Sequence, residues 1–121
     1  MHIADLSTGN LGANGIVGAG IPIGVGAALG ASIRGEKAVT AVFFSDGASN
    51  QGPFAEAMNL AAIWDLPVLF VLENNHYAVS TPVEAVSRTE DLCERAKGYG
   101  VEAFTVDGNH VLEVYERTRE A

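Results

Sequence analysis

Asp46 and Asn75 are the residues of this sequence whose types and spacing are best suited to chemistry. Each follows the end of a short apolar run, Ala38–Phe44 or Leu66–Leu72, and the two residues are 29 positions apart. That spacing is about the length of one β-α-β unit. Parallel strands of such a unit end at the same edge of a sheet, so we expect the two side chains to lie close together. A carboxylate with neutral oxygens is the donor set that a hard cation such as Mg²⁺ prefers.

The loop that follows Asp46 has features that favour a phosphate group. It reads SDGASNQG over residues 45–52 and leads to Pro53, a residue typical of the first turn of a helix. The free N–H groups of a helix N-terminus attract anions, and Gly47 has no Cβ to keep a ligand from the backbone. These features indicate a Mg²⁺-diphosphate site. The alternative is structural, because Asp-Gly and Asn-Asn are ordinary turn sequences. We interpret the similar DGN segment at 107–109 as such a turn.

Apolar runs alternate with helical patterns along the chain. The expected elements are a loop over 5–18, helices over 19–33, 53–64, 89–97 and 110–120, and strands over 38–44, 66–72 and 102–105. Strands that alternate with helices predict parallel β-α-β units. We therefore expect an α/β fold in a single domain over residues 1–121, a doubly wound and mostly parallel sheet with flanking helices.

The composition fits one globular domain of 121 residues. Hydrophobic residues make up 48% of the chain and charged residues 18%, which excludes a disordered chain. The formal net charge of −8 argues against binding to nucleic acid or to an anionic membrane, because both need a basic face. Cys93 is the single cysteine, so a disulfide framework and a cysteine-rich zinc site are excluded. We expect a reducing, cytoplasmic location.

The segment from Leu6 to Ile33 has no charged residue, but we do not expect it to span a membrane. It contains eight glycines, a proline and few large aliphatic side chains. A spanning helix needs about 20 predominantly apolar residues. The small residues Gly20, Gly24 and Ala27 recur at helical spacing and favour close packing within a folded domain instead.

Residues 43–82 resemble a known cofactor-binding motif. They read FFSDGASNQGPFAEAMNLAAIWDLPVLFVLENNHYAVSTP. This is similar to the thiamine-diphosphate motif of 2-oxo-acid dehydrogenase alpha subunits, a family that includes the pyruvate, branched-chain and acetoin dehydrogenases. Residues 11–29 (LGANGIVGAGIPIGVGAAL) and 106–121 (VDGNHVLEVYERTREA) resemble the family's segments before and after it. The resemblance covers essentially the whole chain. It implies the thiamine-diphosphate-binding fold, with thiamine diphosphate and Mg²⁺ as cofactors.

The resemblance also implies roles for individual residues. Asp46 and Asn75 would ligate Mg²⁺ through their side chains, and Tyr77 would do so through its backbone carbonyl. The backbone of Gly47 and Ala48 would approach the diphosphate. These five residues form the implied metal and diphosphate site.

Two further residues and the partners follow from the same resemblance. Gly15 and Val17 would line the aminopyrimidine side of the cofactor. A beta subunit of the dehydrogenase would supply the glutamate that activates the aminopyrimidine, so Glu56 and Glu73 are not assigned that role. The other implied partners are a lipoyl-bearing acyltransferase component and a 2-oxo acid or acetoin as substrate. We expect an oligomer, and we assign no catalytic residue within this chain.

The sequence departs from the family pattern in two respects. Ser45 stands where the family usually has glycine, and the chain is much shorter than family alpha subunits, as an internal fragment would be. Two other interpretations therefore stay open. One is a fragment of another thiamine-diphosphate enzyme, such as a transketolase-like protein. The other is a non-catalytic interaction domain that retains the fold.

Overall fold

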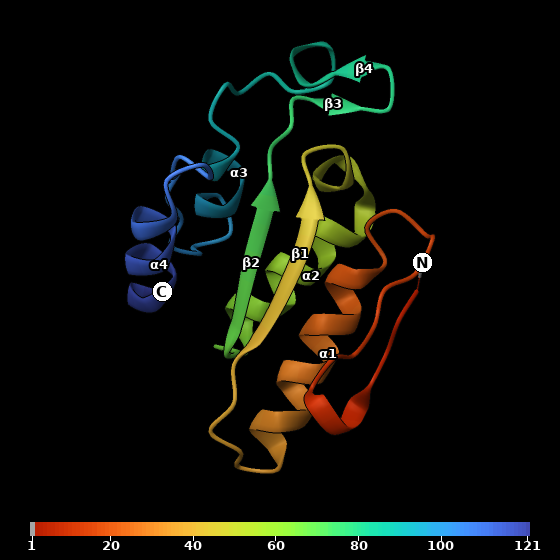
Figure 1. The fold of residues 1–121 in the computed structure, drawn as a ribbon, viewed down its shortest axis with the longest axis vertical. Coiled ribbons are helices and arrows are strands. Elements are labelled where there is room, and N and C mark those ends of the chain that lie inside the picture. Colours follow the sequence, from red (N-terminus) through yellow and green to blue (C-terminus); the bar gives the residue numbers. More distant parts are fainter. Residues whose placement is uncertain (1) are drawn as a thin grey trace.

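A computed structural model describes residues 2–121, and Met1, the first residue of the predicted domain, lies outside the described residues. The helices and strands are α1 (Gly20–Ile33), β1 (Thr40–Ser45), α2 (Gly52–Ile63), β2 (Val68–Glu73), β3 (Tyr77–Ala78), β4 (Thr81–Pro82), α3 (Cys93–Lys97) and α4 (Val111–Glu120). Short 3₁₀ turns cover Leu6–Thr8, Ala48–Asn50 and Val83–Ala85. β1 and β2 lie in the middle of the ribbon, and α3 and α4 lie on the far side of β2 from α1 (Figure 1).

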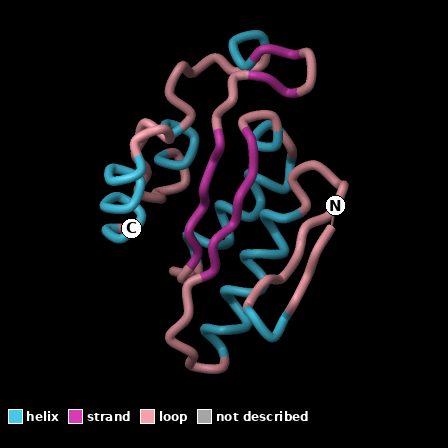
Figure 2. Tube along the Cα trace, in the orientation of Figure 1, coloured by secondary structure: helices cyan, strands magenta, loops and turns pink. Residues whose placement is uncertain are grey.

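β1 and β2 form a parallel pair, with Thr40 opposite Val68 and Ser45 opposite Glu73. The chain passes from one strand to the other through α2, so the three elements make one β-α-β unit. β3 and β4 pair antiparallel in a small hairpin beyond the end of β2 (Figure 2). The predicted α/β class, a parallel sheet with flanking helices, is confirmed.

The core lies between one face of this sheet and the helices α1 and α2. Successive side chains of a strand point to opposite faces, so Val42 and Phe44 of β1 share the inner face. The ring of Phe44 lies 5.8 Å from that of Phe54 and 6.4 Å from that of Phe70, measured between centroids. Phe43, on the other face of β1, is 65% exposed. The buried core residues are Ile21, Val25, Val42, Phe54, Ala57, Met58 and Ala61.

α1 lies close to β1 because a residue without a side chain stands at their contact. A Cβ at Gly24 would overlap the Cγ2 methyl of the buried Val42. Pro22 is in the first turn of α1, where its missing N–H breaks no helical hydrogen bond. The helix predicted over 19–33 is thus confirmed.

In the described part of the chain, no helix is long and apolar enough to cross a membrane.

The strand predicted over residues 102–105 is wrong, because this segment is irregular. The backbone of this segment joins no sheet among the described residues, and its side chains contact α4 and the residues just before α3. Thr105 Oγ1 donates a hydrogen bond to Asp91 Oδ1 at 3.1 Å, and the guanidinium of Arg117 lies 5.4 Å from the ring centroid of Phe104. Among residues 2–121 no strand pairs with this segment, so its alternating pattern has no ladder to extend.

The short helix predicted over 89–97 begins later than expected, at Cys93. The side chain of Asp91 accepts the backbone N–H of Cys93 at 2.9 Å, and this local bond competes with an earlier helical start. The helix predicted over 110–120 is confirmed as α4. The turn predicted at 107–109 is also confirmed, since the carboxylate of Asp107 accepts the N–H of Asn109 at 2.9 Å.

The substitution Gly24→Ala tests the close contact between α1 and β1. We expect the free energy of unfolding to fall by about 1–3 kcal/mol, because the added methyl overpacks a buried contact with a β-branched side chain. Gly26→Ala on the same helix is the control, since a Cβ there would meet no atom within 4 Å. We expect that variant to keep its stability or to gain up to about 1 kcal/mol from helix propensity. Chemical denaturation measures both, and equal stability of the two variants would contradict this packing.

Candidate functional site

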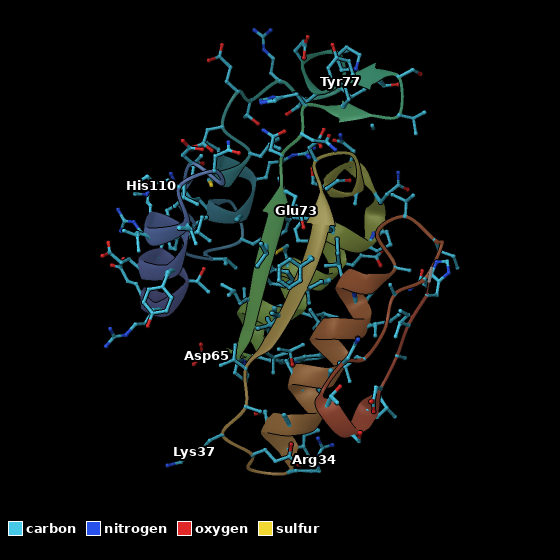
Figure 3. The ribbon with its side chains drawn as sticks, in the orientation of Figure 1. Arg34, Lys37, Asp65, Glu73, Tyr77 and His110 are labelled. Carbon is cyan, nitrogen blue, oxygen red and sulfur yellow. The ribbon has the colours of Figure 1, made fainter. Side chains whose placement is uncertain are left out.

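The carboxyl ends of β1 and β2 place Asp46 and Asn75 at one edge of the sheet. Ser45 and Glu73 are the last paired residues of the two strands. Asp46 directly follows Ser45, and Asn75 follows Glu73 by two residues. In Figure 3 the label of Glu73 marks this edge, and Tyr77 lies beyond it in the hairpin. The prediction from the strand spacing, that these segments meet, therefore agrees with the fold.

The side chain of Asp46 is buried without a full set of partners. It is 1% exposed, and within residues 2–121 no donor reaches its Oδ1 atom. A buried carboxylate oxygen without a donor raises the free energy of the folded chain. A cation removes that cost, because it supplies the missing positive charge. Asp46 could therefore hold a cation at this edge of the sheet.

The backbone of the loop after Asp46 is folded tightly on itself. The hydroxyl of Ser49 donates to the carbonyl oxygen of Asp46 at 2.6 Å, and the N–H of Ser49 donates to the same oxygen at 3.1 Å. The hydroxyl of Ser45 accepts the N–H of Ala48 at 3.4 Å. Ser45 thus makes a weak local contact and leaves the loop compact.

Gly47 is needed for a close approach and not for an unusual backbone conformation. Its φ is −60°, which any residue adopts. A Cβ at Gly47 would lie 2.6 Å from the Cβ of Ala78, however, well inside contact distance. The loop after β1 and the hairpin after β2 therefore touch at this point. Asp46, Gly47, Ala48, Asn75 and Tyr77, all predicted for the metal and diphosphate site, come from these two touching segments.

Asn75 and Tyr77 are exposed, and Asn75 also shapes the local turn. Its Oδ1 accepts the N–H of Tyr77 at 3.0 Å, and Asn74 binds the N–H of His76 in the same way at 3.1 Å. His76 has a φ of 68°. An amide oxygen has two lone pairs, so Asn75 retains one for a further partner. The side chain of Tyr77 is 54% exposed and does not belong to the core.

The segment with Gly15 and Val17 lies beside the loop rather than within it. Gly18 is buried with a φ of 83°, and a Cβ there would lie 3.1 Å from the Cβ of Gln51. This contact brings the segment before α1 next to the residue after the 3₁₀ turn. The side chain of Val17 is 62% exposed, so it is free to contact a ligand or another chain.

Sequence reasoning missed one residue that contacts this loop. Arg95 on α3 donates to the Ser49 hydroxyl at 2.8 Å, to the Ser49 carbonyl at 3.1 Å and to the Asn50 side chain at 2.6 Å. An open groove of about 600 Å³ runs beside it, between the start of α2 and α3. The partners are more than forty positions apart in the sequence, so no local pattern pointed to them.

The described residues hold no cluster of three or more His, Cys, Asp or Glu side chains that could bind a metal. A site at Asp46 would therefore combine one carboxylate with amide, carbonyl and external oxygens. That set suits Mg²⁺ better than Zn²⁺, which prefers nitrogen and sulfur ligands. His110 is not available as a ligand through Nδ1, because this atom accepts the N–H of Glu113 at 3.2 Å.

Comparison with known proteins gives matches along the whole chain. The family described as Dehydrogenase E1 component matches residues 1–121. The chain is 51% identical to the alpha subunit of acetoin:2,6-dichlorophenolindophenol oxidoreductase from Bacillus subtilis, over 100% of this chain and 36% of the relative. It is 52% identical to the protein of the same name from Cupriavidus necator, over 99% and 36% of the two chains. It is 45% identical to the pyruvate dehydrogenase E1 component subunit alpha of Zymomonas mobilis, over 94% and 32%. The chain thus spans about a third of the length of these relatives.

The substitution Gly47→Ala tests the contact between the loop and the hairpin. We expect it to destabilise the protein by about 1–3 kcal/mol, since one of the two segments must move away from the other. Amide hydrogen exchange should become faster in residues 76–83. Gly52→Ala is the control, because a Cβ there would meet no atom within 4 Å. Exchange rates in the hairpin that are the same in both variants would rule out the contact.

Proposed function

The chain belongs to the dehydrogenase E1 component family, and we propose that it forms the Mg²⁺- and thiamine-diphosphate-binding part of an alpha subunit in a 2-oxo-acid or acetoin dehydrogenase complex. One observation carries the proposal. Among the described residues no donor reaches the buried Oδ1 atom of Asp46, which lies at the carboxyl edge of a parallel strand pair. Ligands of open parallel sheets bind at this edge.

We assign the metal to three groups of this chain. The side-chain oxygens of Asp46 and Asn75 and the backbone carbonyl of Tyr77 would hold Mg²⁺. The cation would be needed for electrostatic reasons, because the buried Asp46 carboxylate would otherwise repel an anionic diphosphate. The backbone of Gly47 and Ala48 would approach the diphosphate. The N–H of Ala48 is held at 3.4 Å by Ser45, a weak bond that a phosphate oxygen could replace.

The remaining parts of the proposal concern the reactive end of the cofactor and the partners. When bound, the cofactor supplies the electron sink for loss of carbon dioxide or cleavage of the substrate. Gly15 and the exposed side chain of Val17 would line its aminopyrimidine side. A beta subunit would supply the activating glutamate, and a lipoyl-bearing acyltransferase would accept the acyl unit. We propose a cytoplasmic oligomer, in which this chain binds and orients the cofactor and moves no proton itself.

The orphaned carboxylate favours this function over a non-catalytic interaction domain, and the similar proteins favour it over a transketolase-like enzyme. In a non-catalytic interaction domain, a buried oxygen without a partner would serve no function. Replacement of Asp46 by an apolar residue would then stabilise the fold. The names of the similar proteins favour an E1 alpha subunit over a transketolase-like enzyme, since they are those of acetoin oxidoreductase and pyruvate dehydrogenase alpha subunits.

The substitution Asp46→Asn separates a metal ligand from a structural residue. The variant keeps the shape of the side chain but removes its charge. We expect the cofactor-free protein to be no less stable than the wild type, because the unpaired buried charge is gone. We also expect it to lose the stabilisation by Mg²⁺ and thiamine diphosphate, which in the wild type reaches about 2.7 kcal/mol at 100 times the dissociation constant.

The measurement is thermal unfolding of the natural full-length subunit with its partner chains, with both cofactors or with a chelator. Asp107→Asn is the control, since Asp107 is exposed and its carboxylate only closes a turn. The control should keep the Mg²⁺-dependent shift in melting temperature. A wild type without such a shift, or equal losses in both variants, would refute the proposed function.

A further inference from the structure

We propose that Arg95 is a positioning residue for the cofactor loop, and that it holds the backbone of Asp46 in place through the hydroxyl of Ser49. This inference rests on the proposed function, because it concerns the geometry of the same metal site. Arg95 contacts neither Asp46 nor the groups assigned to Mg²⁺ directly. It acts through the 3₁₀ turn Ala48–Asn50, which follows Asp46.

A chain of short hydrogen bonds joins Arg95 to Asp46. Arg95 Nη1 donates to Ser49 Oγ at 2.8 Å, and Ser49 Oγ donates to the carbonyl oxygen of Asp46 at 2.6 Å. A hydroxyl has one proton to donate, so Ser49 must accept from Arg95 and donate to Asp46. Ser49 is 3% exposed, so its bond to Asp46 is buried, whereas its bond to Arg95 is partly buried beside the open groove. The direction of donation is therefore fixed. The guanidinium of Arg95 donates to Ser49, and Ser49 donates to the backbone of Asp46.

The guanidinium of Arg95 donates hydrogen bonds to the turn at more than one point. Nη1 also donates to the carbonyl oxygen of Ser49 at 3.1 Å, and Nη2 donates to Asn50 Oδ1 at 2.6 Å. The rigid planar fork of arginine suits such multiple contacts, whereas a lysine ammonium acts as a point charge. All three contacts lie within the turn, so together they resist a rotation that would move Asp46.

Among residues 2–121, Arg95 differs from the paired basic residues in having no carboxylate partner. Within the described range, the salt bridges are Arg34–Glu36, Lys97–Glu94 and Arg117–Glu120, all at exposed side chains. The charge of Arg95 is directed instead at uncharged oxygens of the loop. In a chain with a net charge of −8, this leaves a positive charge beside the loop where the anionic diphosphate is proposed to bind.

α3 is a firm support for Arg95 although it has only five residues. The side chain of Leu92 is buried, and Asp91 Oδ1 accepts both the N–H of Cys93 at 2.9 Å and the hydroxyl of Thr105 at 3.1 Å. The Cys93 sulfur lies 3.2 Å from Thr105 Oγ1. Burial raises the pKa of the Cys93 thiol, so it stays protonated beside Thr105. These bonds tie the start of α3 to the segment before α4.

The experiment compares Arg95→Met and Arg95→Lys with Lys97→Met in the natural full-length subunit assembled with its partner chains. Lys97→Met is a matched control, because Lys97 is on the same helix and its replacement removes the same charge, while its ammonium forms a salt bridge with the exposed Glu94 rather than with the loop. Calorimetry measures the dissociation constant of Mg²⁺ at saturating thiamine diphosphate in the cofactor-free enzyme. Thermal unfolding of the cofactor-free form reports the stability of each variant separately.

We expect Arg95→Met to bind Mg²⁺ about 10- to 100-fold more weakly than the wild type, the range found when residues that orient metal ligands are lost. Arg95→Lys should recover part of the affinity through a single hydrogen bond to Ser49, and Lys97→Met should bind as the wild type does. Ser49→Ala should weaken binding to a similar extent as Arg95→Met. This second variant tests the same hydrogen-bond chain if Arg95→Met fails to fold.

Three outcomes would overturn the inference. Unchanged Mg²⁺ affinity in Arg95→Met, with wild-type binding intact, would refute the role of Arg95 and leave the proposed function standing. A lower melting temperature with unchanged affinity would assign Arg95 a purely structural role. Failure of the wild type to bind Mg²⁺ with thiamine diphosphate would refute the proposed function itself, and the inference with it.

Discussion

The burial of one carboxylate, that of Asp46, is the constraint on which the rest of this structure depends. The side chain is almost fully enclosed at the end of β1, and one of its oxygens has no donor among the described residues. A chain can maintain such a group only if stabilising contacts elsewhere offset its cost. The parallel pairing of β1 with β2, the core beneath it and the bonds from Ser49 to the Asp46 backbone provide those contacts.

Close contacts at three glycines hold the elements around this edge together. Gly24 lets α1 lie against Val42 on β1, and Gly47 lets the loop after β1 meet Ala78 of the hairpin. Gly18 brings the N-terminal segment against the residue after the 3₁₀ turn. The contacts at Gly18 and Gly47 set the distances of two segments from the loop with Asp46, and the contact at Gly24 sets the distance of α1 from β1. Gly18 and Gly24 of the glycine-rich first third therefore serve close packing, and the candidate site lies where the loop after β1, the hairpin and the segment before α1 approach one another.

Much of this arrangement could be predicted from the sequence because it depends on local properties of the chain. Apolar runs with polar ends predicted β1 and β2, and the positions of Asp46 and Asn75 after those runs predicted that they share an edge. The helix over 19–33 and the turn at 107–109 also follow from short-range patterns. The family resemblance rests on the same residues, and the match over residues 1–121 agrees with it.

What the sequence by itself determined was the order and type of most elements and the polar residues at the strand ends. The tertiary structure alone decided that residues 102–105 are irregular, that Asp46 is left with an orphaned oxygen, and that Arg95 reaches Ser49. These features depend on contacts between segments distant in the chain. A local pattern encodes which face of an element is apolar, but packing decides which distant group meets that face, and whether a buried polar atom finds a partner there.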